Sequence, residues 1–175
     1  MKTSVIVAGA RTPIGRFNGA LKNLSATDLG GLAIKAAIER AGIAPNQVQY
    51  LIMGQVLQAG AGQGPARQAA IKAGIPLDVP SIVINKLCLS GLNAIALADQ
   101  LIRANEYDVI VAGGMESMSN APHLLMNSRA GFKLGDAILN DSMIFDGLFC
   151  SIDQMGVGEA TEKYNSRYKL TREMQ

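Results

Sequence analysis

Ligating and nucleophilic side chains are scarce in this sequence. Its 175 residues include two cysteines, far apart at Cys88 and Cys150, and a single histidine, His123. These are too few for a zinc site with recognisable ligand spacing and too few for a secreted disulfide scaffold. A reducing, cytoplasmic location is therefore expected, and no metal site is expected.

Charge is also sparse, and nucleotide-binding motifs are missing. Charged residues make up 17% of the chain, and the net charge is only +2 with Lys and Arg scattered, so nothing indicates a nucleic-acid groove. The glycines of residues 9–15 lack the spacing of a phosphate loop, and no Gly-x-Gly-x-x-Gly is present. The N-terminal apolar run is too short for a signal sequence or a membrane span, so no membrane association is expected.

Apolar residues and glycine are abundant instead. Hydrophobic residues make up 49% of the chain and glycines number 19, which favours a buried core and many tight turns. The expected elements are a strand over Ser4–Ala8, a helix from a capping box at Ser25 and Asp28 to Gly42, a strand within Val48–Gly54, a helix over Pro65–Ala73, a strand over Ser81–Ile84, a helix from Cys88 to about Asn105, and a strand over Asp108–Ala112. This alternation predicts an α/β domain with a largely parallel sheet.

The periodicity vanishes after Glu116. Residues 119–149 are irregular, and so long an irregular stretch is usually functional or disordered. Helical spacing returns over Gly156–Tyr168, and Thr171 resembles the N-cap of a further helix. Because the chain stops within that helix's first turn, the sequence looks cut short.

The segment from Cys88 to Ile102 carries the chemistry. Its apolar residues fall on every face of a helix, which predicts burial between other layers. A cysteine in the first turn lies beside unpaired backbone N–H groups and the positive end of the helix dipole, and both favour the thiolate. The same N–H groups can hold an oxyanion when the sulfur attacks a carbonyl. The alternative is that Cys88 is only a small buried hydrophobe.

Five stretches, in order along the chain, bear on this choice. They are Ala10-Arg11-Thr12-Pro13-Ile14-Gly15-Arg16-Phe17, Gly54-Gln55-Val56-Leu57-Gln58-Ala59-Gly60, Gly64-Pro65-Ala66-Arg67-Gln68-Ala69-Ala70, Asn85-Lys86-Leu87-Cys88-Leu89-Ser90-Gly91-Leu92-Asn93-Ala94, and Gly113-Gly114-Met115-Glu116-Ser117-Met118-Ser119. Together they resemble the thiolases, the acetyl-CoA acetyltransferase family. The resemblance favours a reactive Cys88.

The resemblance implies a fold. Thiolases have two similar α/β halves stacked as an α-β-α-β-α sandwich, with the nucleophile helix buried between the sheets. Residues 1–118 would then be the N-terminal α/β domain. Residues 119–175 would begin the loop domain that covers coenzyme A and, in tetrameric members, forms an arm between dimers. His123 is interpreted as a surface or interface residue.

The resemblance also implies a reaction. Cys88 would be acylated by an acyl-CoA, and a second acetyl-CoA would attack the thioester to give acetoacetyl-CoA, with thiolysis as the reverse. Leu148, Gln154 and Met155 match positions at the pantetheine and acyl pocket, although many members have His-Met-Gly where this chain has Gln154-Met155-Gly156. Coenzyme A thioesters are substrates, and no other cofactor is implied.

Partners and alternatives follow from the same comparison. The glycine-rich loop Val56–Gly64 would border a subunit interface, so a homo-oligomer, a dimer or a tetramer, is expected. The family's catalytic histidine, asparagine and second cysteine have no counterpart here, so residues 1–175 alone are expected to be inactive. A β-ketoacyl condensing enzyme or hydroxymethylglutaryl-CoA synthase of the same fold, and a non-catalytic assembling fragment, are the alternatives.

Overall fold

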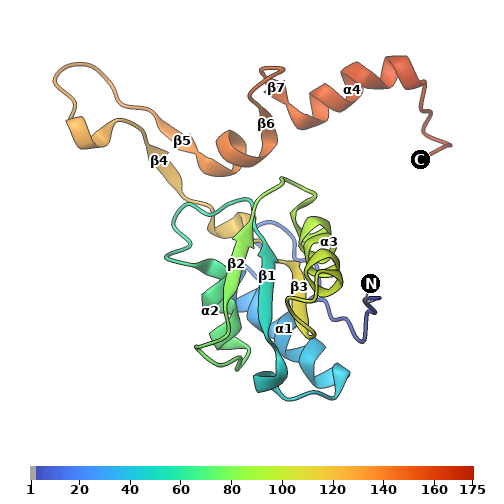
Figure 1. The fold of residues 1–175 in the computed structure, drawn as a ribbon. Helices are drawn as coiled ribbons and strands as arrows, with labels where there is room; N and C mark the ends of the chain where they lie inside the picture. Colours follow the sequence, from blue (N-terminus) through green and yellow to red (C-terminus); the bar gives the residue numbers. More distant parts are fainter. Residues whose placement is uncertain (1–2) are drawn as a thin grey trace. The chain divides into compact units, whose positions relative to one another are not determined.

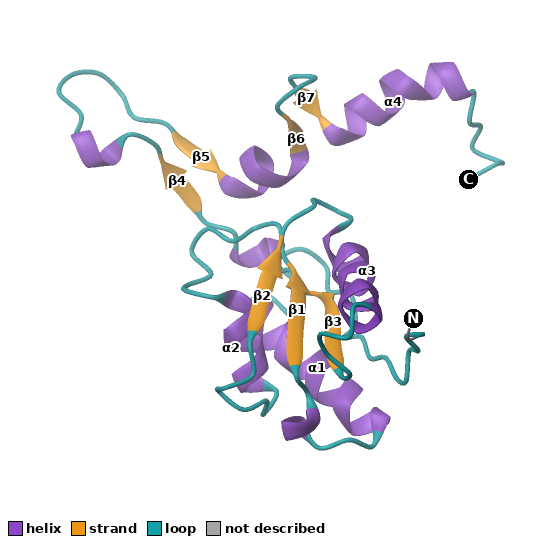
Figure 2. Cartoon of the chain, in the orientation of Figure 1, coloured by secondary structure: helices purple, strands orange, loops and turns teal. Residues whose placement is uncertain are grey.

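A computed structural model describes residues 3–175, apart from the side chain of Ser166. The chain forms two compact units, Met1–Ala121 and Pro122–Gln175. Each unit is built from its own elements (Figures 1 and 2). The predicted roles of residues 119–175 in covering coenzyme A and in assembly stay predictions.

The first unit is built on a parallel sheet of three strands in the order β2-β1-β3. These are β1 (Tyr50–Gly54), β2 (Ser81–Ile84) and β3 (Ile110–Gly114). Strand β1 is central, since it pairs with β2 on one side and β3 on the other, and it is the most buried strand of the sheet. The sheet is parallel because each strand returns through a helix, as the α/β prediction requires.

Helices cover both faces of this sheet. Helices α1 (Ala26–Ala41) and α2 (Pro65–Lys72) lie on one face and α3 (Ser90–Arg103) on the other (Figure 1). Because successive side chains of a strand point to opposite faces, Leu51 and Met53 pack with α1 and α2, and Ile52 packs with α3. The predicted α/β class is confirmed.

The helix ends follow local sequence. Ser25 caps α1 and forms the predicted capping box with Asp28, and Gly42 ends the helix with a left-handed φ of 67°. Pro65 opens α2, and Asn105 follows α3 with a φ of 66°. A short 3₁₀ turn, η1 (Pro45–Gln47), leads into β1. These helix predictions are confirmed because each depends on residues close together in sequence.

The predicted strand over Ser4–Ala8 is wrong. The segment has no regular structure, and Ile6 is 84% exposed. It is tied to the unit by side chains, since Ser4 Oγ donates to Asp99 of α3 and Arg40 of α1 donates to the Gly9 carbonyl. A β-strand needs a hydrogen-bonding neighbour, and no strand among the described residues pairs with this one.

The predicted burial of the Cys88 helix on all sides is also wrong for this chain. Ala94 and Ala98 of α3 are buried against the sheet, but Leu92 is 62% exposed and Leu89 and Ile95 are also exposed. The sheet can cover only one side of a helix. Among the described residues of the first unit, no second layer covers the other side.

The second unit consists of short elements. A 3₁₀ turn, η2 (Met118–Asn120), precedes it at the end of the first unit. The unit then contains a strand pair, β4 (His123–Leu125) with β5 (Leu139–Asp141), the 3₁₀ turn η3 (Ser128–Ala130) between them, a π-helical segment η4 (Met143–Leu148), a hairpin of β6 (Phe149–Cys150) with β7 (Met155–Gly156), and helix α4 (Val157–Tyr168). The predicted helix over Gly156–Tyr168 is confirmed. Thr171 accepts the Met174 N–H as an N-cap would, but residues 171–175 form a turn.

Candidate active site

Cys88 lies where the three strands of the sheet end together. The strands finish at the aligned residues Gly54, Ile84 and Gly114, and the segment after β2 carries the cysteine. Loops at the carboxyl edge of a parallel sheet are the usual place for ligand sites in α/β folds. Cys88 is exposed there and free of any disulfide.

The position of Cys88 within the helix differs from the prediction. Helix α3 begins at Ser90, with Leu89 as the N-cap residue, so Cys88 precedes the helix instead of lying in its first turn. Leu87, just before it, has a φ of 50°. A left-handed φ at a residue other than glycine costs roughly 1–3 kcal/mol and often marks a functional turn.

Side-chain hydrogen bonds hold this turn. Asn85 Oδ1 accepts the Leu87 N–H at 2.9 Å, and Ser90 Oγ accepts the Lys86 N–H at 2.7 Å while donating to the Leu87 carbonyl at 2.6 Å. The backbone N–H groups of Leu89 and Ser90 donate to carbonyls within the turn. Within the described residues, the turn's hydrogen bonds leave the Cys88 N–H unused, so it can donate to a ligand.

Glycines bring α3 against the strand ends. A Cβ on Gly54 would lie 2.5 Å from the Ser90 carbonyl carbon and 2.6 Å from the Gly91 nitrogen, and one on Gly114 would lie 3.3 Å from the Gly91 Cα. A Cβ at Gly54 does not fit without a shift of the α3 backbone, and one at Gly114 would be a tight contact, so the two glycines permit the close approach. The start of α3, and with it the Cys88 turn, is therefore seated directly on the end of the sheet.

Glu116 follows β3 and contacts the segment after β1. Its carboxylate accepts the Val56 N–H at 2.8 Å and the Leu57 N–H at 3.3 Å. Desolvation raises the pKa of Glu116, while the N–H bonds of Val56, Leu57 and Ser117 oppose the rise. Nothing in the local sequence indicates this contact, because it joins residues 60 positions apart.

Glu116 also lines a cavity of about 160 Å³ beside α1. The N-terminal segment contributes Arg11 and α1 contributes Leu29 and Ala33. Arg11 Nη1 donates to the Thr12 carbonyl at 2.9 Å. The cavity therefore lies between the N-terminal segment, α1 and the end of β3.

The other predicted site residues lie together in the second unit. Gln154 is exposed in the turn of the β6–β7 hairpin with a φ of 52°, Met155 is half-buried in β7, and half-buried Leu148 ends η4 just before β6. All three residues therefore belong to the β6–β7 hairpin or directly precede it. Their predicted role in binding the pantetheine and acyl group stays a prediction.

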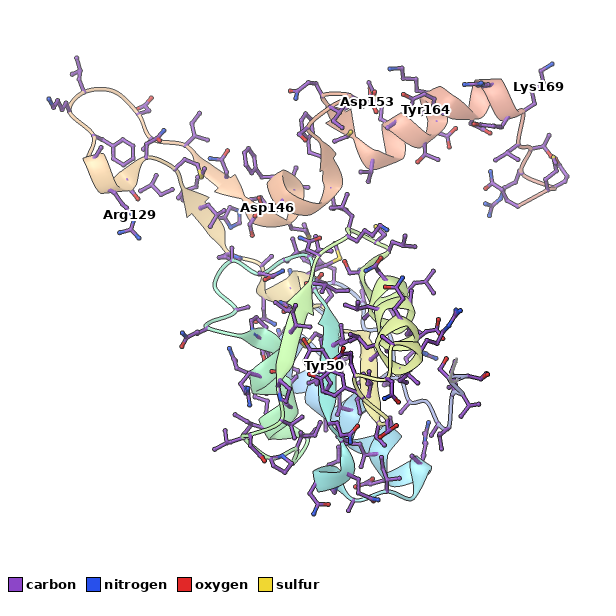
Figure 3. The ribbon with its side chains drawn as sticks, in the orientation of Figure 1. Tyr50, Arg129, Asp146, Asp153, Tyr164 and Lys169 are labelled. Atoms are coloured by element: carbon purple, nitrogen blue, oxygen red, sulfur yellow. The ribbon has the colours of Figure 1, made fainter. Side chains whose placement is uncertain are left out.

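Cys150 and His123 also lie in the second unit. Cys150 is half-buried in β6, where its Sγ accepts the Asp153 N–H at 3.4 Å. Asp153 also accepts from Tyr164 of α4 at 3.3 Å (Figure 3). Cys150 is therefore part of a local structural cluster. His123 is exposed in β4, as the interpretation of a surface residue expects.

The part of the chain that the structure describes lacks two other kinds of feature. No three His, Cys, Asp or Glu side chains gather as metal ligands there. No helix there has the length and apolar character needed to cross a membrane.

Comparisons with known proteins identify the family of this chain. The sequence model of the family described as "Thiolase, N-terminal domain" matches residues 4–175. The chain is 60% identical over its full length to a "Probable acetyl-CoA acetyltransferase" of Mycobacterium leprae and 53% identical to an "Acetyl-CoA acetyltransferase" of Cupriavidus necator, and it covers 44% of each. It is 51% identical over 176 aligned positions to an "Acetyl-CoA acetyltransferase" of Escherichia coli, of which it covers 45%. The chain thus spans less than half the length of these relatives, and it belongs to the thiolase family through that family's N-terminal domain.

Proposed function

We propose that this chain is the nucleophile-bearing part of an acyl-CoA C-acetyltransferase, with Cys88 as the residue that accepts the acyl group. The observation that carries the proposal is the exposed Cys88 thiol on a left-handed turn at the carboxyl edge of the sheet. The names of the relatives, acetyl-CoA acetyltransferases, support the choice of an acetyl-CoA substrate. No cofactor beyond the coenzyme A thioesters themselves is proposed.

The first half-reaction moves an acetyl group to the cysteine. The Cys88 thiolate attacks the thioester carbonyl carbon, and the bond from that carbon to the coenzyme A sulfur breaks. Coenzyme A leaves as a thiolate and takes up a proton. The negative charge that develops on the carbonyl oxygen in between would be held by the Cys88 N–H, which the turn leaves unused. One oxyanion donor contributes roughly 10²–10³-fold to the rate.

The second half-reaction forms a carbon–carbon bond. A second acetyl-CoA, deprotonated at its methyl carbon, attacks the acyl-cysteine carbonyl, and the bond to the cysteine sulfur breaks. Acetoacetyl-CoA is released and the thiolate is restored. The covalent intermediate divides one difficult step into two. Thiolysis of a 3-ketoacyl-CoA is the same path in reverse.

Binding of the substrate's pantetheine arm is assigned to residues of the second unit. Leu148, just before β6, and Met155, in β7, are half-buried apolar side chains, and they would contact the arm. Gln154 can donate a hydrogen bond, as the histidine of many family members can, but it does not titrate near neutral pH.

Acetyl transfer to the chain tests the proposal. We expect that incubation with acetyl-CoA, followed by peptide mapping in a mass spectrometer, will place one acetyl group on the peptide containing Cys88. Cys88→Ala should remove the label, and Cys150→Ala, which leaves the first unit untouched, should retain it. Labelling of Cys150 in the wild-type chain, or of any residue in Cys88→Ala, would show that the site assignment is wrong.

A further inference from the structure

The segments that follow the three strands are joined by hydrogen bonds. The Met115 N–H, after β3, donates to the Gly54 carbonyl at 2.9 Å, and the Gln55 N–H, after β1, donates to the Ile84 carbonyl at 3.0 Å. These bonds extend the pairing of the sheet one residue past each strand. The segment after β1 therefore lies between the segment of Glu116 and the segment of Cys88.

Glu116 fixes the middle segment. Its carboxylate accepts hydrogen bonds from the N–H groups of Val56 and Leu57. The Gln55 side chain donates to the Leu57 carbonyl at 2.9 Å. A half-buried carboxylate that accepts several N–H groups makes strong, charge-assisted hydrogen bonds. The proposed chemistry does not use Glu116, so its burial and its contacts need another explanation.

Asn85 continues the connection to the cysteine. Its Nδ2 donates to the Val56 carbonyl at 3.4 Å, and its Oδ1 accepts the Leu87 N–H at 2.9 Å. The segment after β1 thus donates the Val56 and Leu57 N–H groups to Glu116 and accepts a hydrogen bond from Asn85 at the Val56 carbonyl. Asn85 therefore links this segment to Leu87, the residue with a left-handed φ that precedes Cys88.

We propose that Glu116 is a positioning residue for Cys88 and acts through Val56, Leu57, Asn85 and Leu87, here called the Glu116–Asn85 network. The proposal rests on the proposed function, in which the Cys88 N–H must be aimed at the acyl oxygen. Fixing Leu87 in its left-handed conformation sets the direction of the peptide that carries this N–H. A donor displaced by a fraction of an ångström loses much of its effect on a developing oxyanion.

Two substitutions remove the Glu116 hydrogen bonds to different extents. In Glu116→Gln one oxygen remains to accept the Val56 N–H, and the position keeps its shape but loses the charge. In Glu116→Ala the N–H groups of Val56 and Leu57 lose their acceptor. Glu106→Gln is the matched control, because Glu106 is an exposed carboxylate of the same unit whose side chain lies outside the network.

The first measurement is amide hydrogen exchange by NMR on the 175-residue chain. The Leu87 N–H donates to Asn85 and not to Glu116. We nevertheless expect it to exchange about tenfold faster or more in Glu116→Ala, and by an intermediate factor in Glu116→Gln. Amides of buried residues of α1, such as that of Ile38, should keep their rates in both Glu116 variants, and Leu87 should keep its rate in Glu106→Gln. Unchanged exchange at Leu87 in Glu116→Ala would overturn the proposal. Equal acceleration at Ile38 would do the same, because it would show general destabilisation.

The second measurement compares two reactions of the same thiol. Acetyl transfer from acetyl-CoA needs an oriented N–H donor, whereas alkylation by iodoacetamide develops no oxyanion. Glu116→Ala should slow acetylation of Cys88 by about tenfold or more relative to alkylation, and Glu116→Gln should restore part of the rate. Equal slowing of both reactions would refute a positioning role.

Asn85→Asp tests the route of the effect. Aspartate retains an acceptor for the Leu87 N–H but loses the donor to the Val56 carbonyl. If Glu116 acts through Asn85, adding Glu116→Gln to Asn85→Asp should change Leu87 exchange less than Glu116→Gln does alone. Additive effects would overturn the route. If the wild-type chain takes no acetyl group while Leu87 responds as expected, the proposed function fails and the positioning of the turn stands.

Discussion

The glycine at the end of β1 offers a sharp test of how the Cys88 turn is seated. In Gly54→Ala the new Cβ would lie 2.5 Å from the Ser90 carbonyl carbon, 2.6 Å from the Gly91 nitrogen and 2.7 Å from the Ser90 Cβ. Two of these atoms are backbone of the first turn of α3, so no side-chain rotation relieves the overlap. The helix start must move away from the sheet, because ordinary contact begins at 3.4 Å.

The expected cost follows from that displacement. Forcing an extra carbon into a packed junction typically costs about 1–3 kcal/mol. With a urea dependence of about 1–3 kcal/mol per molar for a small protein, the unfolding midpoint of the first unit should fall by roughly 1 M. Displacing Ser90 also moves its Oγ, which holds Lys86 and Leu87 in the turn. Acetylation of Cys88 should therefore slow as well.

Gly113→Ala is the matched control. It adds the same methyl group in the neighbouring strand β3, where the new Cβ would meet only the Met53 sulfur at 3.9 Å. Alanine costs less than glycine in a strand by roughly 0.5–1 kcal/mol, so the midpoint should stay unchanged or rise. Urea titration followed by circular dichroism measures both variants. Equal midpoints for Gly54→Ala and Gly113→Ala would show that the close approach of α3 to the sheet is not as described.

Four further outcomes are expected. Ser25→Ala removes the α1 capping box and should lower the free energy of unfolding by about 1 kcal/mol in urea titration, whereas an unchanged value would mean the cap is not formed. The pKa of Asp28 is lowered from 3.8 to about 2, chiefly by the hydrogen bond from Lys72 and next by Ser25. Its stabilisation should therefore be complete above roughly pH 5, be lost as the pH falls through about 2, and be missing from the acid titration of Asp28→Asn. Light scattering at micromolar concentration should show at least a dimer, and a monomer would refute the proposed homo-oligomer. Residues 1–175 should show no sustained cleavage of acetoacetyl-CoA, because positioned acid–base groups contribute roughly 10²–10⁴-fold and the only histidine lies exposed in β4; turnover near that of a full-length relative would refute this.

Local sequence predicts the helices of this protein well and its first strand badly. Ser25, Asp28 and Gly42 act on residues within a few positions of themselves, so their pattern is enough to place α1. The β-branched residues of Ser4–Ala8 are equally typical of a strand. A strand, however, forms only where another strand offers hydrogen bonds, and that condition is set by distant parts of a chain.

The burial of α3 also depends on parts of the structure that are distant in sequence. The apolar pattern from Cys88 to Ile102 predicts a helix in contact with apolar surface all round, and the sheet supplies such a surface on one side. Leu89, Leu92 and Ile95 remain exposed on the other. The apolar pattern therefore predicts which faces of the helix could be buried, whereas the structure of this chain shows that only one face is buried.

Some features of the candidate site are indicated by the sequence motif, and others are seen only in the structure. The residue types around Cys88 indicate a reactive cysteine, and the resemblance to thiolases indicates its partners in the reaction. The left-handed Leu87, the Ser90 hydroxyl under the turn and the carboxylate of Glu116 behind the Val56 segment belong to no local pattern. Each depends on the three strands ending at aligned residues, so that segments distant in sequence meet at one edge. A candidate nucleophile can therefore be predicted from its neighbours in sequence, whereas the geometry proposed to aim its N–H group depends on the register of the sheet.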